Sequence, residues 1–296
     1  MRAFIALVRR EYLEHRGPFL YAPLILIAVV TFLILLSLAS GSYHFNFPTR
    51  VALNFRVFDT GYLGIAVLWL GYLFIALFFY FADAFNADRR NNQMFFWKSM
   101  PQTDFTVLFS KLVAGLTILP AMVFFALLLN GVIAAALTFV APYVLPVLAA
   151  PDVAGTATAW VDTSLVALLY MVLALLWYAP FFAWVGALST VVGRWSIPLA
   201  LLIPVVFSLF EGVIDFGSAP GGSYILSFLR QRLTFYFGDL AVIQQAAITN
   251  QPPDLSVIAA NLVGGIDWVS LLAGLVFAIV VIWLASEYRR RSVLKG

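Results

Sequence analysis

The residues best suited to recognition gather in one segment, NADRRNNQMFFWKSMPQTDFTVLFSKLV, which covers residues 86–113. Its first part carries the charged residues Asp88, Arg89 and Arg90, and a run of three aromatic residues follows. Because aromatic and arginine side chains supply much of the binding energy at protein interfaces, this composition is typical of a docking surface with a charged rim. The aromatic run and the lysine after it are Phe95, Phe96, Trp97 and Lys98.

Catalytic chemistry is not indicated in the sequence. The chain has no cysteine, and its two histidines, His15 and His44, lie far apart, so we expect no metal site. The motifs H-E-x-x-H and G-x-S-x-G do not occur, and no pair of carboxylates has a spacing that fixes acid–base catalysis. The phosphate-binding motif G-x-x-x-x-G-K-[ST] is also missing. We therefore expect no enzyme activity and no cofactor in this chain.

The composition predicts an all-α membrane protein. Of the 296 residues, 63% are hydrophobic and only 10% are charged, whereas a soluble domain averages about 25% charged residues. A helix needs about 20 mainly apolar residues to cross a bilayer. Six segments qualify, and we predict six spans in a single transmembrane domain over residues 1–296. They cover residues 19–39, 62–82, 112–140, 164–192, 197–214 and 266–286.

Lysine and arginine residues set the expected orientation, because they are enriched in cytoplasmic segments. Placing both termini, segment 83–111 and the turn 193–196 on one side puts most of the 17 basic residues there. Topology thus accounts for the basic residues, and we expect no nucleic-acid partner. The other side then holds only Arg50, Arg56, Arg230 and Arg232. We therefore predict an integral membrane protein with both termini in the cytoplasm.

The connections between spans also carry structural signals. Residues 1–17 predict an amphipathic helix in the cytoplasmic headgroup plane; the alternative is a charged extension that only sets topology. Prolines predict an irregular outer connection over 141–163. Within the outer connection 215–265, segment 223–248 is too polar to span, and its helices would lie in the outer interface or dip into the membrane. The apolar stripe of the first helix consists of Phe4, Ile5, Val8, Tyr12 and Leu13.

The predicted spans are almost free of charge inside. Asn130 is the main polar residue of the third span, and Glu211 and Asp215 lie toward the outer end of the fifth. These two carboxylates either reach water at the outer interface or form the rim of a pathway. Ion-coupled transporters keep ionisable residues near the midplane, so this chain has little to use for ion coupling. Transport would instead need a motor that acts on segment 83–111 or on the turn around Arg194.

Segment 83–115 resembles the membrane subunits of ABC-2 type ABC exporters. In that family the loop after span two carries a pattern near E-[KR]-E-x-G-T-x-E-x-L-L-x-[ST]-P, followed by a lysine that opens span three. The residues in the matching places are Asp88, Arg89, Ser99, Pro101 and Lys111. The stretch FFWKSMPQTDFTVLFSK is similar to a branch of bacterial permeases with F-W-[KR]-S-[LM]-P-x-[ST]-D. Asn92, Gln93 and Phe95 depart from the general pattern.

The resemblance implies a six-span ABC-2 (type V exporter-like) fold that pairs with a second copy or a paralogue and docks on separate ATPase subunits. These subunits would bind ATP and Mg²⁺, and the protein would lie in the bacterial cytoplasmic membrane. A short helix ending at Pro101 would grip the ATPase, and Thr103 or Asp104 would cap the next helix. Spans two and five would line the pathway, and the outer helices would cap it. The coupling residues would be Asp88, Arg89, Arg90, Phe95, Phe96, Trp97, Lys98 and Arg194. The pathway candidates would be Trp69, Tyr72, Phe79, Asn130, Phe207, Phe210 and Glu211.

The aromatic residues of spans two and five favour an apolar or amphipathic cargo, such as a peptide antibiotic, a lipid or a drug. Two other functions remain open. The chain would otherwise be a membrane scaffold or sensor that works with the same kind of ATPase without transport. A membrane enzyme acting on lipids would require a catalytic cluster, which the sequence does not offer.

Overall fold

The computed structural model describes residues 2–40, 57–90, 103–144, 151–214, 224–233 and 255–293. These residues are almost entirely helical, and none of them lies in a strand. In chain order the elements are α1 (Arg2–Glu14), the π-helix η1 (Gly17–Tyr21), α2 (Ala22–Ser40), α3 (Val57–Arg90), α5 (Asp104–Val144), α6 (Val153–Val192), the 3₁₀-helix η2 (Gly193–Trp195), α7 (Ser196–Ile214), α8 (Tyr224–Leu233), α10 (Leu255–Gly264) and α11 (Trp268–Val293).

Within the described ranges, five helices are long and apolar enough to cross a membrane, so the prediction of an all-helical membrane protein is confirmed. They correspond to the first, second, third, fourth and sixth predicted spans. The fifth predicted span falls on α7, whose apolar part, Ser196–Glu211, is shorter. The five helices cover Gly17–Ala39, Gly61–Phe85, Asp104–Val144, Val153–Val192 and Trp268–Arg291.

The third and fourth predicted spans are longer in the structure than in the sequence-based prediction. α5 has 41 residues and α6 has 40, which corresponds to about 60 Å each at 1.5 Å per residue. The expectation of an irregular connection over 141–163 is therefore wrong for 141–144 and 153–163. α5 continues through Pro142, and the Asp152 carboxylate caps α6 by accepting hydrogen bonds from the amides of Ala154 and Gly155.

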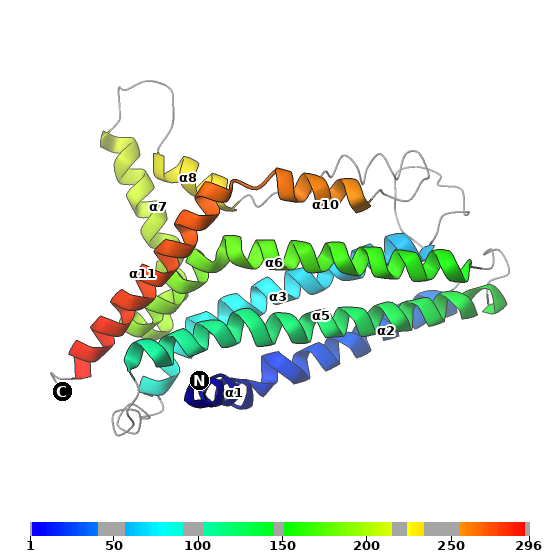
Figure 1. The fold of residues 1–296 in the computed structure, drawn as a ribbon, viewed down its shortest axis with the longest axis horizontal. Coiled ribbons are helices and arrows are strands. Elements are labelled where there is room, and N and C mark those ends of the chain that lie inside the picture. The colour runs from blue at the N-terminus through cyan, green and yellow to red at the C-terminus, as the bar shows by residue number, and fades with distance from the viewer. Residues whose placement is uncertain are drawn as a thin grey trace.

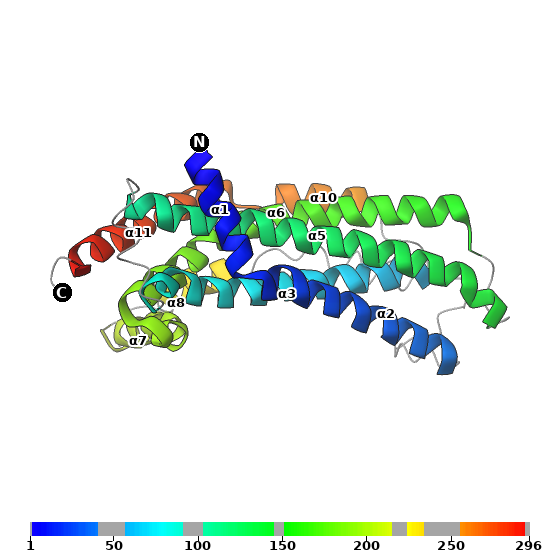
Figure 2. The ribbon, with the colours of Figure 1, turned by 90° about the horizontal axis from the view of Figure 1, so that it is seen from below.

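α3 is the central helix of the bundle. It runs beside both α5 and α6 (Figure 1) and packs extensively on each. α2 lies along α5, and α1 crosses α5 steeply (Figure 2). α11 contacts α6 and α5, while α10 lies alongside α6. This arrangement makes α3, α5 and α6 the inner layer and leaves α2, α7 and α11 at the periphery.

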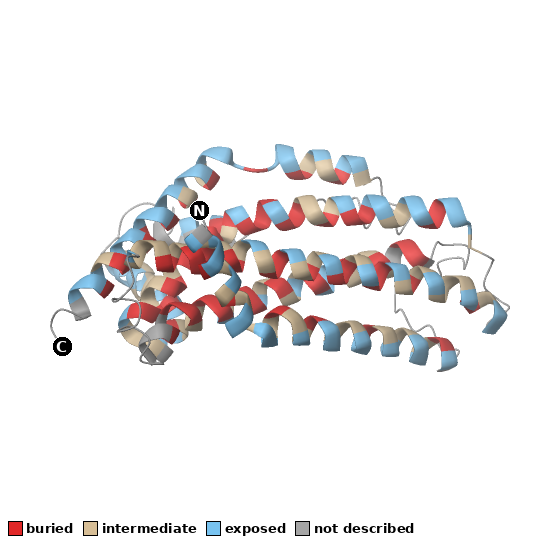
Figure 3. Cartoon of the chain, turned by 60° about the horizontal axis from the view of Figure 1, so that its bottom comes forward, coloured by how far each residue is buried: buried red, intermediate tan, exposed pale blue. Residues whose placement is uncertain are grey.

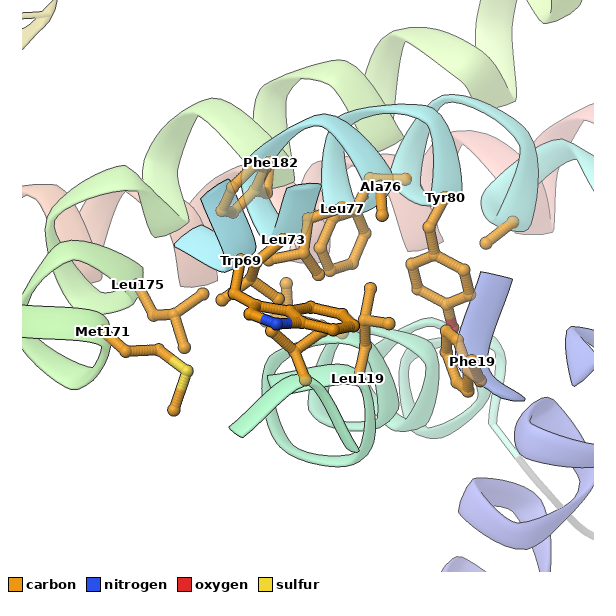
Figure 4. Close-up of a cluster of buried hydrophobic side chains, with 14 of the residues drawn as sticks. Phe19, Trp69, Leu73, Ala76, Leu77, Tyr80, Leu119, Met171, Leu175 and Phe182 are labelled. Atoms are coloured by element: carbon orange, nitrogen blue, oxygen red, sulfur yellow. The ribbon is translucent and has the colours of Figure 1, made fainter. Parts of the chain in front are cut away.

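The buried face of α3 follows a seven-residue repeat. Tyr62, Trp69 and Ala76 form one row, and Ala66 with Leu73 belongs to a second. This spacing keeps one stripe of the helix against its neighbours along its whole length. Figure 4 shows the middle of this core, where side chains of α3 meet Leu119 of α5 and Phe182 of α6.

Glycines on α5 let the aromatic residues of α3 approach closely. A Cβ atom at Gly115 would lie 2.6 Å from Cζ of Phe81 and 2.7 Å from Cε1 of Tyr80. A Cβ atom at Gly131 would lie 2.5 Å from a ring atom of Tyr62. Small residues allow such close helix packing in membranes, where little hydrophobic force drives helices together.

The peripheral helices carry exposed apolar residues. Figure 3 shows the exposed residues of the molecule in pale blue. On α7, Leu201, Phe207 and Phe210 are 64%, 59% and 63% exposed. On α11, Leu272 and Trp283 are 60% and 56% exposed. Such surfaces suit a surrounding of lipid tails.

The predicted helix at the N-terminus is confirmed as α1, but the residues of its predicted apolar stripe differ in burial. Leu7 and Glu11 face the protein, whereas Ile5 and Leu13 are 64% and 44% exposed. The reason is that Glu11 has a buried partner on α5, which fixes the rotation of α1 about its axis. The exposed row Ile5, Arg9 and Leu13 points away from the bundle.

The substitution Gly115→Ala is expected to destabilise the protein by about 1–3 kcal/mol, because the added methyl group must displace the rings of Tyr80 and Phe81. Unfolding with denaturant in mixed micelles measures this change. The control is Gly71→Ala, since no atom outside its own helix lies within 4 Å of a Cβ at Gly71. Equal effects of the two substitutions would contradict the packing described for α3 and α5.

Candidate functional site

One end of the bundle brings buried charges together, and we name it the charged end. It consists of Glu11 and His15 near the end of α1, Tyr80 on α3, Asp104 and Lys111 in the first turns of α5, and Arg289 at the end of α11. In Figure 1 these helix ends lie on the side of the molecule where the N- and C-termini are labelled. The last turn of α3 and the first turn of α5 also flank residues 91–102, the core of the segment predicted to bind a partner.

An ion pair between Glu11 and Lys111 joins α1 to α5. Nζ of Lys111 donates to Oε1 of Glu11 at 2.9 Å, and Lys111 is fully buried while Glu11 is 3% exposed. The hydroxyl of Tyr80 lies 3.3 Å from Oε2 of Glu11 and 3.1 Å from the carbonyl oxygen of Lys111, and donates toward both. Buried charges are tolerated only when such partners satisfy them, so three helices depend on one another here.

Aromatic side chains keep water away from this pair. The ring of His15 meets the ring of Tyr80 edge-on at 5.0 Å, and the buried Phe19 lies 5.4 Å from Tyr80 between ring centroids. Nδ1 of His15 lies 3.2 Å from the carbonyl oxygen of Glu11 and 3.7 Å from its carboxylate. Low polarity strengthens the attraction between Glu11 and Lys111, and it also makes the loss of either partner costly.

A second ion pair joins α11 to the beginning of α5. Nε of Arg289 lies 3.3 Å from Oδ1 of Asp104, and Arg289 is 4% exposed. An acidic residue in the first turn of a helix and a basic residue in the last turn both interact favourably with the helix dipole. Next to this pair, Glu287 binds Arg290 and Arg291 at 2.8 Å on the surface of α11.

The start of α5 is fixed by a cap as well. The amide of Thr106 donates to Oγ1 of Thr103 at 3.2 Å, so the prediction that Thr103 or Asp104 caps this helix is confirmed. The first turns of α5 are therefore held by the Thr103 cap, by α11 through Asp104 and by α1 through Lys111.

The ion pairs of the charged end are suited to holding helices together. Within the described part of the chain, no group of three or more His, Asp or Glu residues is arranged to hold a metal ion. Its carboxylates are engaged by cations: Glu11 by Lys111 in the interior and the partly exposed Asp104 by Arg289. The arrangement can hold helices together and transmit movement between them.

The structure also joins the two segments expected to face a motor. The hydroxyl of Ser196 donates to the carbonyl oxygen of Ala82 at 3.4 Å, which places the turn 193–196 beside the last turns of α3. Gly193 has φ 60°, a left-handed conformation that favours glycine, so the chain can reverse sharply there. The predicted tight turn is confirmed.

The predicted coupling residues are only partly placed. Asp88, Arg89 and Arg90 end α3, and Arg194 lies in η2, but their side chains lie outside the described residues. The remaining predicted coupling residues, Phe95, Phe96, Trp97 and Lys98, lie outside the described residues altogether.

The predicted pathway residues fall into two groups. Trp69 and Asn130 are buried against each other, with Nε1 of Trp69 donating to Oδ1 of Asn130 at 3.0 Å. Tyr72 donates its hydroxyl to the carbonyl oxygen of Pro18 at 2.6 Å. The other candidates lie nearer the surface: Phe79, Phe207 and Phe210 are 59%, 59% and 63% exposed, and Glu211 is half-buried.

Sequence reasoning does not identify the partners at the charged end. It places Lys111 only as a motif position, and it assigns no role to Glu11 or Arg289. A signal is present for Glu11, because it lies four residues after Leu7 on the same helix face. An acidic residue on an apolar face, in a chain with so few charges, indicates a buried partner.

No family model, curated protein or solved structure matches this chain.

Breaking the ion pair with Lys111→Met is expected to destabilise the protein by about 3–5 kcal/mol, because Glu11 is left buried without a counter-charge. The double variant Glu11→Met with Lys111→Met should recover most of that loss. Denaturant unfolding of both variants in mixed micelles gives the comparison.

The matched control is Arg290→Met, which breaks a pair whose arginine is 67% exposed. An exposed ion pair contributes little to stability, so this change should be small. A double variant no more stable than Lys111→Met alone would contradict the pairing described here.

Proposed function

We propose that this chain is the membrane subunit of an ATP-driven ABC exporter, coupled to separate ATPase subunits. The observation that carries the proposal is the charged end, which ties α1, α3, α5 and α11 around the two ends of segment 91–102. An external motor needs such a junction, since a push on a loose loop would not reach the spans. The family pattern in the same segment, with Lys111 in its matching place, supports the same function.

The contacts suggest how force would travel. An ATPase that displaces residues 91–102 would move the first turn of α5 and the last turn of α3 together. The Glu11–Lys111 pair would carry the movement to α1 and α2, and the Asp104–Arg289 pair would carry it to α11. Because the turn 193–196 contacts α3 through Ser196, α7 would move as well.

α7 would serve as the fifth of six spans. It has 19 residues, which corresponds to about 28 Å at 1.5 Å per residue, close to the thickness of about 30 Å of a bilayer's hydrocarbon core. Both termini and segment 83–111 would then lie in the cytoplasm of a bacterial cell, as the distribution of basic residues indicates.

The pathway would form between two such subunits, either two copies or this chain and a paralogue. The exposed Phe79 on α3 and the exposed Phe207 and Phe210 on α7 are the pathway candidates available to a partner without rearrangement. Their aromatic rings suit an apolar or amphipathic cargo. Trp69 and Asn130 would instead stabilise each subunit internally.

Co-purification of the tagged full-length chain from its native membrane tests the proposal. We expect an ATPase with a P-loop and an ABC signature, at one ATPase per membrane subunit. Deleting residues 91–100 should abolish this association, and Trp97→Ala should weaken it by about tenfold or more, as expected for an aromatic anchor.

The control is Trp283→Ala, which removes an exposed tryptophan from α11 and should leave the association unchanged. Normal association after the deletion would refute coupling through this segment. Association and coupled ATP hydrolysis without any cargo dependence in lipid vesicles would instead favour a scaffold or sensor.

A further inference from the structure

Arg232 of α8 is a buried cation at the opposite end of α11 from the charged end. It is 3% exposed and lies between α6 and α11. Its carbonyl oxygen accepts a hydrogen bond from Nε1 of Trp177 at 2.8 Å, and its Cζ lies 4.6 Å from the centroid of the same ring. Its Nη2 donates to the carbonyl oxygen of Ser270 on α11. One residue thus fastens α8 to two spans.

A glycine provides the space for the guanidinium. A Cβ atom at Gly274 would lie 2.6 Å from Nη2 and 3.1 Å from Cζ of Arg232. Gly274 lies one turn after Ser270 on α11, so the helix offers a carbonyl oxygen and a notch at the same place. Planar guanidinium groups fit such sites, because they can stack on an aromatic ring and donate hydrogen bonds at the same time.

The start of α11 adds a negative charge nearby. Asp267 accepts hydrogen bonds from the hydroxyl of Ser270 at 2.6 Å and from its amide at 3.1 Å. These bonds hold the pKa of Asp267 below its usual value, so the carboxylate is ionised at neutral pH. Burial lowers the pKa of Arg232, and the charge of Asp267 opposes that change. Asp267 thus offsets part of the cost of burying the charge of Arg232.

In this docked position, however, Arg232 does not use all of its hydrogen-bond donors. Its Nη1 is buried and, among the residues that the structure describes, has no hydrogen-bond partner. A buried donor without a partner costs free energy, and for a charged group the cost is larger. In water the same atom would be solvated. The docked state therefore gains the contacts with Trp177 and Ser270 and loses the hydration of Nη1. This loss offsets part of the free energy gained on docking, so a released state can be populated.

We propose that Arg232 is a releasable latch that holds α8 against α6 and α11. In the released state the guanidinium leaves the notch at Gly274 and α8 moves away from Trp177. Since α8 also contacts α7, release would free the outer end of that helix. The latch is a property of this chain alone and does not depend on the proposed partnership with an ATPase.

Distance measurements between two spin labels test the latch. The chain has no cysteine, so labels can be placed at Ser227→Cys on α8 and Ala157→Cys on α6, both exposed positions. In the full-length chain in lipid nanodiscs we expect two distances, with the docked one predominant. Gly274→Ala, which keeps the arginine but fills its notch, should raise the ratio of released to docked chains about tenfold. Arg232→Lys should populate the same second distance.

The matched controls are Gly71→Ala, where a Cβ meets no neighbouring atom, and Arg230→Lys, which alters an exposed arginine of the same helix. Neither should change the ratio. A single distance in the parent chain would overturn the proposal, and so would an unchanged ratio in Gly274→Ala. If the variants only broaden the docked distance, Arg232 merely stabilises α8 and is not a latch.

Discussion

The structure depends on the cost of burying charge in a chain that is 63% hydrophobic and 10% charged. A lysine without solvent access is stable only beside a counter-charge that is itself hydrogen-bonded. Lys111 meets this condition through Glu11 and Tyr80, and the requirement fixes the rotation of α1, the start of α5 and the inner face of α3 together. The contacts between α1, α3 and α5 at the charged end therefore follow from electrostatics, and the apolar faces of these helices pack around them.

Glycine and aromatic residues set the rest of the architecture. Gly115 and Gly131 on α5 receive rings from α3, which lets three long helices pack closely in surroundings where lipid competes for every apolar surface. Gly274 on α11 also leaves space for a neighbouring group, which here is the guanidinium of Arg232 and not an aromatic ring. In the first case the contact is apolar and complete. The contact of Arg232 at Gly274 is charged, and its Nη1 has no hydrogen-bond partner among the described residues. This contact is therefore the more readily opened of the two.

Much of the fold could be predicted from the sequence, since long apolar runs identify five of the helices and Gly193 identifies the reversal before α7. The sequence-based prediction underestimates the lengths of α5 and α6, because prolines usually signal loops, whereas Pro142 lies within α5 and Asp152 caps α6. The pairing of Glu11 with Lys111 joins residues 100 positions apart. Periodicity places each residue on its own helix, but it does not say which faces meet.

The central claim is that segment 91–102 is the place where an external ATPase acts on this bundle. Site-specific photocrosslinking in cells tests it directly, with p-benzoylphenylalanine in place of Phe96 and, as control, in place of Tyr143, which is 88% exposed near the end of α5. The account predicts a covalent adduct with an ABC-type ATPase from position 96 and none from position 143. Adducts from position 96 with lipid alone, or with proteins that lack a P-loop, would contradict it.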